Sequence, residues 1–137
     1  MGLVYADIEI SNSFEKEAAR RGLLDKDAVK TMNFHMMVDT GVMMPAINET
    51  IQQVFNFPFM ERKRAVLADG RMIECDVVGP VDYRWQNRTS SCKALVLPEG
   101  CEPLFGAIPM EEMDIYVHPL SGRLMGNHPD YPIMMLK

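Results

Sequence analysis

The sequence predicts a mostly β protein, and we expect residues 1–137 to form a single domain. Two observations carry this prediction. Apolar residues in the middle of the chain alternate with polar residues at the spacing of a strand, and clusters of Gly, Asn, Asp and Ser separate these segments as turns do. The hydrophobic share of 47% and the charged share of 24% are typical of a folded globular chain. A length of 137 residues suffices for one hydrophobic core.

The first part of the chain predicts two strands separated by a helix or a loop. Residues 3–10, "LVYADIEI", are rich in β-branched and aromatic side chains and predict a strand. A short helix is expected next, with Ser13 as its N-cap and Gly22 as its stop, although a loop is the alternative. The alternating segment 31–41, "TMNFHMMVDTG", predicts a strand that ends at Asp39.

Two hairpins are expected in the middle of the chain. Residues 45–57 precede them and fit either a short amphipathic helix or irregular chain. Residues 64–79 predict the first hairpin, because Asp-Gly is favoured where both central turn residues need positive φ. Residues 81–98 predict a second hairpin that turns between residues 86 and 91. The turn of the first hairpin consists of Ala68, Asp69, Gly70 and Arg71.

The last part of the chain predicts short elements. Leu104 and Phe105 read as the end of an apolar strand, followed by Gly106 and a helix of one or two turns that begins at Pro109. A strand is expected at residues 114–117, "DIYV", before a Ser-Gly turn.

Composition narrows the possible partners and cofactors. The net charge is -5 and the one basic run, residues 61–65, is short, so we expect no nucleic-acid partner. No apolar run approaches the roughly 18 to 20 residues of a membrane span, and no secretion signal is evident, so we expect a cytoplasmic protein with no membrane partner. The cysteines and histidines lack metal-ligand spacing, so we expect no metal, no cofactor and free, mostly buried thiols.

Asp39 is the residue that most needs a chemical explanation. It interrupts the apolar segment 36–49, "MMVDTGVMMPAINE", and a carboxylate between apolar stretches is costly to desolvate unless its charge is held. A strand end followed by a small hydroxyl residue and glycine presents such a carboxylate to backbone N–H groups. The triplet Asp39, Thr40 and Gly41 is therefore a candidate catalytic loop, with a structural Asx-turn as the alternative.

The order of these features resembles the retropepsin-like aspartic proteases, most closely their small prokaryotic members. The features are an apolar strand, "VDTG", an Asp-Gly hairpin, an apolar-apolar-Gly segment and a short helix, and they span residues 33–125. The resemblance implies a closed, antiparallel β barrel with one short C-terminal helix. It also implies an aspartic endopeptidase that needs neither a metal nor an organic cofactor.

The resemblance assigns a role to each candidate residue. Asp39 matches the catalytic aspartate, Thr40 the residue that braces the paired loops across a dimer axis, and Gly41 the turn glycine. Leu104, Phe105 and Gly106 match the segment that supports the catalytic loop from beneath. The hairpin turn at Ala68, Asp69, Gly70 and Arg71 matches the flap that closes over substrate.

Aspartic protease chemistry needs two carboxylates, and this chain has one Asp-Thr-Gly triplet, so the resemblance implies a homodimer acting on a peptide or protein substrate. Four apolar residues are candidate walls for the substrate side chains, with plain core packing as the alternative: Met43, Met44, Val66 and Met72. The apolar chain ends, residues 1–10 and 130–137, either build the dimer interface or pack on their own chain.

Two other hypotheses remain for the function. Val42 and Met43 follow the triplet where the family commonly has alanine and then serine or threonine, so the chain could instead be an inactive dimer that binds peptides or a protein partner. The second hypothesis is an unrelated β-rich enzyme or binding domain.

Overall fold

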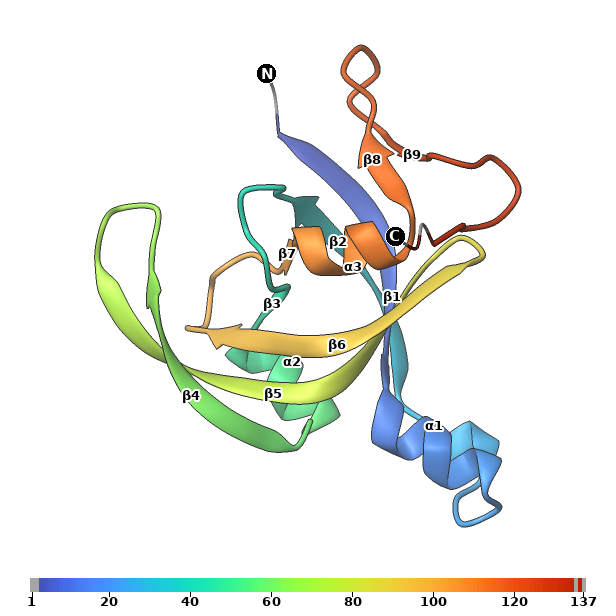
Figure 1. The fold of residues 1–137 in the computed structure, drawn as a ribbon. Coiled ribbons are helices and arrows are strands. Elements are labelled where there is room, and N and C mark those ends of the chain that lie inside the picture. The colour runs from blue at the N-terminus through green and yellow to red at the C-terminus, as the bar shows by residue number, and fades with distance from the viewer. Residues whose placement is uncertain (1–2, 135, 137) are drawn as a thin grey trace.

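The computed structural model describes residues 3–134 and 136, and the fold is mostly β, as predicted. Seven strands form one sheet in the order β1-β2-β7-β3-β6-β5-β4, and β1 also pairs with β5 (Figure 1). Six strands therefore form a ring, and β4 lies outside it on β5. The strands are β1 (Val4–Asn12), β2 (Thr31–Val38), β3 (Ala46–Asn48), β4 (Phe59–Val66), β5 (Met72–Trp85), β6 (Arg88–Leu97) and β7 (Leu104–Phe105).

Strand β5 lets the ring close because it changes its neighbour on one edge. Its first half pairs with β4, from Met72 to Val78, and its second half pairs with β1, from Val81 to Arg84. The expectation of an antiparallel sheet is only partly right, since β2 runs parallel to β7 and β3 runs parallel to β6. The other pairings in the ring are antiparallel.

Residues 3–134 contain three α-helices, so the fold has more helices than the one short C-terminal helix that the resemblance implied. Both segments for which a loop was the alternative are helical, as α1 (Ser13–Arg20) and α2 (Glu49–Phe55). The third helix is α3 (Ala107–Glu112), and a short 3-10 helix, η1 (Lys26–Ala28), precedes β2. In the described part of the chain, no helix is long and apolar enough to span a membrane.

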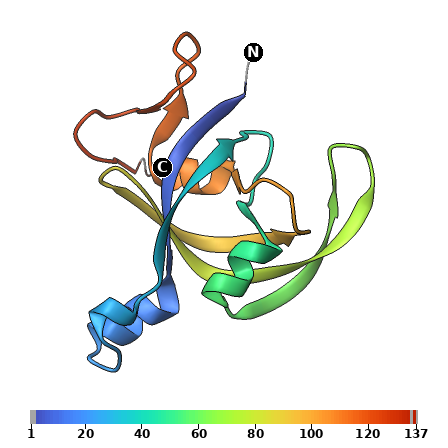
Figure 2. The ribbon, with the colours of Figure 1, turned by 180° about the vertical axis from the view of Figure 1, so that it is seen from behind.

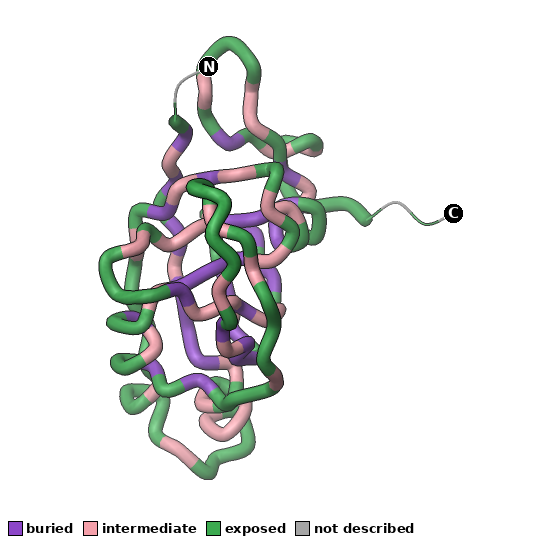
Figure 3. Tube along the Cα trace, turned by 90° about the vertical axis from the view of Figure 1, so that its left-hand side faces the viewer, coloured by how far each residue is buried: buried purple, intermediate pink, exposed green. Residues whose placement is uncertain are grey.

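Helices α2 and α3 cover the ring from opposite sides, as the views in Figures 1 and 2 show. Helix α2 buries Ile51 and Phe55 in the main hydrophobic core, and α3 buries Met110 in the same core. The strands supply the rest of this core, including the fully buried Ile8 and Phe105. Figure 3 shows buried backbone concentrated along these elements and exposed backbone at the hairpin turns and loops.

Several boundaries differ from the sequence prediction. The N-cap of α1 is Asn12 and not Ser13, because the Asn12 side chain accepts the Glu15 N–H at 3.1 Å. Helix α3 begins at Ala107, two residues before the expected Pro109. The second hairpin turns more tightly than expected, at residues 86 and 87, because Trp85 already pairs with Arg88.

The first hairpin turns at the expected residues, but with a different backbone geometry. Gly70 has a φ of 88°, whereas Asp69 is not among the residues with positive φ. The Gly70 N–H donates to the Leu67 carbonyl at 2.9 Å, and the Leu67 N–H donates to the Arg71 carbonyl at 2.8 Å. This pattern is a three-residue connection that needs one left-handed residue, so glycine is required only at position 70.

A separate two-stranded hairpin follows α3. It pairs β8 (Ile115–Val117) with β9 (Leu124–Gly126) and lies beside the start of β1 in both ribbon views. The expected strand at residues 114–117 is therefore present, beginning one residue later. Residues 1, 2, 135 and 137, which belong to the apolar chain ends considered for a dimer interface, lie outside the described residues.

Candidate active site

Asp39 follows the last residue of β2, at the place where β7 lies between β2 and β3. The Asp39 N–H donates to the Phe105 carbonyl at 3.1 Å, and the Val42 N–H donates to the Asp39 carbonyl at 3.2 Å. One bond ties the aspartate to the neighbouring strand and the other closes its own turn. The backbone of Asp39 is therefore held from both sides.

The turn that begins at Asp39 fixes the orientation of the Asp39 carboxylate. Its Oδ1 accepts the Gly41 N–H at 2.9 Å, and a Cβ at position 41 would lie 3.2 Å from the same oxygen. Asp39 is half-buried, while Thr40 and Gly41 are exposed. The charge thus keeps partial access to water and gains a backbone donor, which answers how a carboxylate is tolerated within this apolar segment.

The loop after Asp39 rests on the start of α3. The Ala107 N–H donates to the Val42 carbonyl at 2.7 Å, and the Ile108 N–H donates to the Met43 carbonyl at 2.9 Å. These bonds use the N–H groups that a helix start leaves free, which explains why α3 begins before Pro109. A Cβ at Gly106 would lie 2.6 Å from the Val42 carbonyl oxygen, so only glycine permits this approach.

The structure therefore brings together the two segments that the sequence singled out. Residues 39–41 and 104–106 are adjacent through β2–β7 pairing, in which Met37 lies opposite Leu104 and Val38 opposite Phe105. Thr40 is exposed at the turn. The contact that the resemblance predicts for its hydroxyl would be made with a second subunit.

An apolar cavity of about 480 Å³ lies beside Asp39. Asp39 is its one ionisable lining residue in the described chain, and the other residues that line it are Leu3, Val4, Met37, Val38, Thr40, Val117 and Pro119. Sequence reasoning missed the contribution of the first strand and of the β8–β9 hairpin. The signals were Leu3 at the chain start, Val117 at the end of β8 and Pro119 just after it, but nothing local places them beside residue 39.

The hairpin turn at Ala68, Asp69, Gly70 and Arg71 is exposed and does not line the Asp39 cavity in the described chain. It lies at the same end of the ring as the loop after Asp39, as Figures 1 and 2 both show. The Arg71 N–H and Nε donate to the Asp69 carboxylate at 2.9 and 2.7 Å. The backbone bond from Arg71, and then its side chain, lower the pKa of Asp69.

The candidate wall residues are not core residues. Met43, Val66 and Met72 expose 65%, 67% and 64% of their surface, and Met44 is half-buried. Core packing, the alternative interpretation of these positions, is therefore wrong for the first three. They present apolar surface on the Asp39 loop and on the two arms of the first hairpin, where water would be displaced by any molecule that binds there.

No family model and no curated protein matches this chain, so the site is interpreted from its own geometry. Within residues 3–134 and 136, no three His, Cys, Asp or Glu side chains are grouped so that they could hold a metal ion. The arrangement offers one partly hydrated, backbone-anchored carboxylate beside an apolar cavity. Such a group can accept or donate a proton, and a second carboxylate brought next to it would share that proton.

Proposed function

We propose that the protein is an aspartic endopeptidase of the retropepsin type that acts as a homodimer. The observation that carries the proposal is the Asp39 loop itself, in which the turn directs the carboxylate, β7 holds the backbone and α3 supports the following residues. The six-stranded ring is compatible with the closed barrel that this type of protease requires.

The proposed chemistry uses one Asp39 from each subunit. Two carboxylates close together cannot both ionise cheaply, so the pair holds one proton, as the paired carboxylates of aspartic proteases do in general. The ionised carboxylate takes a proton from a water molecule as the water oxygen attacks the scissile carbonyl carbon. The protonated carboxyl donates its proton to the carbonyl oxygen. The ionised carboxylate then takes one hydroxyl proton from the tetrahedral intermediate as its C–N bond breaks, and the amine leaves with the proton of the other carboxyl.

The face around the Asp39 cavity is the proposed dimer interface. With a net charge of -5, two copies of the chain repel each other, and association costs least through an apolar face with few charges. Leu3 and Leu120 expose 74% and 92% of their surface at the start of β1 and in the turn of the β8–β9 hairpin. Leu3 lines the cavity and Leu120 follows Pro119, which also lines it, so we propose that both leucines belong to this apolar face.

Substrate is proposed to bind as an extended peptide between the Asp39 loop and the first hairpin. The exposed Met43, Val66 and Met72 then pack against its side chains, and the hairpin backbone offers hydrogen bonds of the strand type. This proposal favours apolar residues next to the scissile bond.

A dimer that binds peptides without cleaving them is the second candidate. The observation that favours it is the absence of a hydroxyl at Val42 and Met43, so no side chain from these two positions can donate a hydrogen bond to the Asp39 carboxylate. Under this candidate, Asp39 is a turn residue and has no chemical role.

Replacement of Asp39 by asparagine separates the two candidates. For Asp39→Asn we expect hydrolysis of a peptide library to fall by at least about a thousandfold, with peptide binding retained, because asparagine keeps the turn but cannot exchange the proton. Asp25→Asn, an exposed residue before η1, is the matched control and should cleave like the wild type. A wild-type protein that binds library peptides and cleaves none would favour the second candidate.

A further inference from the structure

Two of the three cysteines are brought into one side-chain cluster by the fold. Cys75 lies on β5, and Cys101 lies in the connection between β6 and β7. A second hydrophobic cluster, separate from the main core, contains the buried Cys75 together with Ala46 and Leu97, and the half-buried Cys101 packs against it. Cys75 exposes 2% of its surface. The two side chains therefore lie in one cluster, although many residues separate them along the chain.

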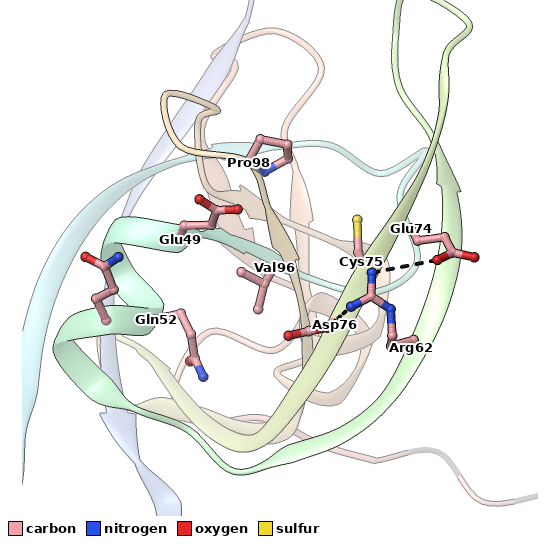
Figure 4. A pocket seen from close by; sticks show the side chains of 9 residues that line it. Glu49, Gln52, Arg62, Glu74, Cys75, Asp76, Val96 and Pro98 are labelled. Atoms are coloured by element: carbon pink, nitrogen blue, oxygen red, sulfur yellow. Dashed lines mark hydrogen bonds and ion pairs between the residues drawn. The ribbon is translucent and has the colours of Figure 1, made fainter.

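A pocket of about 300 Å³ reaches Cys75 from the surface (Figure 4). Arg62 lies at its wall and forms ion pairs with Asp76 at 2.9 Å and with Glu74 at 3.8 Å. The Cys75 sulfur points toward the side of the pocket on which Pro98 lies, and Pro98 begins the connection that carries Cys101. A small solute can approach Cys75 through this opening.

The two thiols are suited to different steps of an oxidation. Burial raises the pKa of the Cys75 thiol, the nearby Arg62 lowers it by a smaller amount, and Asp76 and Cys101 raise it. Cys75 is thus protonated at neutral pH and is a poor first nucleophile, since the thiolate is the reactive form. Cys101 is more exposed and is the thiol that an oxidant meets first.

We propose that Cys75 and Cys101 form a reversible intramolecular disulfide when the protein meets a hydroperoxide. The Cys101 thiolate attacks the peroxide oxygen and breaks the O–O bond, which gives a sulfenic acid and releases hydroxide or alkoxide. The Cys75 sulfur then attacks the Cys101 sulfur, the S–O bond breaks, and water leaves with the Cys75 proton. Both sulfur atoms are oxidised and the peroxide is reduced, and a cellular thiol restores the pair.

The crosslink would join two elements that flank the candidate site. Cys75 belongs to the arm of the first hairpin, and the Cys101 carbonyl accepts the Asn48 Nδ2–H at 2.9 Å, at the N-cap of α2. The disulfide would therefore fix the base of this hairpin to the connection that leads into β7. If the proposed protease function holds, this restriction slows the opening of the hairpin and lowers kcat.

The test is disulfide mapping, which does not depend on any activity of the protein. Reduced full-length protein is treated with hydrogen peroxide, its remaining thiols are alkylated, and its peptides are mapped without reduction. We expect a peptide pair joined through Cys75 and Cys101, one alkylated cysteine at Cys92, and full reversal by dithiothreitol. The oxidised protein should unfold several degrees higher than the reduced protein, because the crosslink restricts the unfolded chain.

Cys92 provides the matched control. It lies on β6, packs against the main core and has its pKa raised to about 11, chiefly by burial. Cys92→Ala should form the same disulfide, and Cys101→Ser should leave Cys75 alkylated after oxidation. The proposal is overturned if Cys75 remains alkylated in the oxidised wild type, if Cys101 ends as a sulfinic acid, or if disulfides join only separate molecules. A protein that forms the disulfide but cleaves no peptide would overturn the proposed function alone.

Discussion

At the scale of single residues, two glycines determine how closely the Asp39 loop approaches its supports. Gly106 faces backbone, since a Cβ there would lie 2.6 Å from the Val42 carbonyl oxygen and 2.8 Å from that of Met43. Gly41 faces a side chain, since its Cβ would lie 3.2 Å from Asp39 Oδ1. A backbone neighbour cannot move without breaking the bonds to α3, whereas a carboxylate can rotate. The two glycines should therefore respond differently to alanine.

We predict that Gly106→Ala destabilises the fold by about 1–3 kcal/mol, because the loop must shift away from α3. Gly41→Ala should cost less than about 1 kcal/mol. If the proposed function holds, Gly41→Ala should still lower kcat by about tenfold or more, because the added methyl group displaces the Asp39 carboxylate from its catalytic orientation. Urea unfolding measures the first effect and peptide hydrolysis the second. Equal stability losses in the two variants would contradict this account.

At the scale of the elements, the longer strands were predictable from the sequence because alternation and turn residues are local signals, whereas the three-residue strands β3 and β9 were not predicted. The segment 31–41 shows this, since its apolar face and the Asp39 turn are both present in consecutive residues. Element ends were not predictable where distant segments set them. Asn12 caps α1 while its Nδ2–H donates to the Phe55 carbonyl at 3.2 Å, and the start of α3 depends on carbonyls of the Asp39 loop.

The candidate site divides in the same way. The triplet at residues 39–41 and the apolar-apolar-Gly segment at 104–106 were visible in the sequence, because each is a local motif. The cavity beside Asp39 was not visible, because Leu3 and Val117 reach it from opposite ends of the chain. A contact between residues so far apart leaves no pattern within any short window of sequence.

The double role of Asn12 leads to a prediction about how α1 and α2 are joined. Asn12→Asp keeps the cap on Glu15 but replaces the donor to Phe55 with a second acceptor, so we expect a loss of about 1–3 kcal/mol. Asn12→Ala also removes the cap and should cost about 1 kcal/mol more. Asn33→Ala on the exposed face of β2 is the control and should stay within about 0.5 kcal/mol of the wild type. Urea unfolding of the three variants decides the matter, and an Asn12→Asp protein as stable as the wild type would show that the Phe55 contact contributes nothing.

At the scale of the whole molecule, Asp114 ties the C-terminal segment to the rest of the chain. Its carboxylate accepts hydrogen bonds from the His128 ring, from Asn127 Nδ2 at 3.1 Å and from the Ile133 N–H at 3.1 Å. The buried Arg88 donates to the His128 carbonyl from the other side. These contacts favour packing of this segment on its own chain over a role in a dimer interface.

This cluster predicts a dependence of stability on acid. The hydrogen bond from His128, followed by those from Ile133 and Asn127, lowers the pKa of Asp114 below its ordinary value. The pKa of this carboxyl is lower in the folded chain than in the unfolded chain, where it is about 4, so the ionised carboxylate stabilises the fold at pH values above about 4. This stabilisation is lost as the pH falls through the pKa of the folded state. Asp114→Asn, which retains the local backbone preference, should therefore show a weaker fall of the unfolding free energy in acid. Parallel pH profiles for the two proteins would refute the assignment.

The assembly of two chains is the property on which the proposed chemistry depends, and Leu120 tests it without touching Asp39. Leu120 exposes 92% of its surface, and its N–H donates to His118 Nδ1 at 3.2 Å, so a fixed turn presents an apolar side chain one residue after Pro119, which lines the Asp39 cavity. Leu23 exposes 79% near α1, at the opposite end of the molecule (Figure 1). Leu120→Asp and Leu23→Asp add the same charge to equally exposed positions. We expect Leu120→Asp alone to weaken dimerisation by at least about tenfold, or about 1.4 kcal/mol, in sedimentation equilibrium, because a carboxylate would have to lose water in the apolar interface. A wild type that sediments as a monomer at every concentration would refute the homodimer. If only Leu23→Asp weakened the dimer, the interface would lie at the α1 end and each Asp39 would have no partner carboxylate.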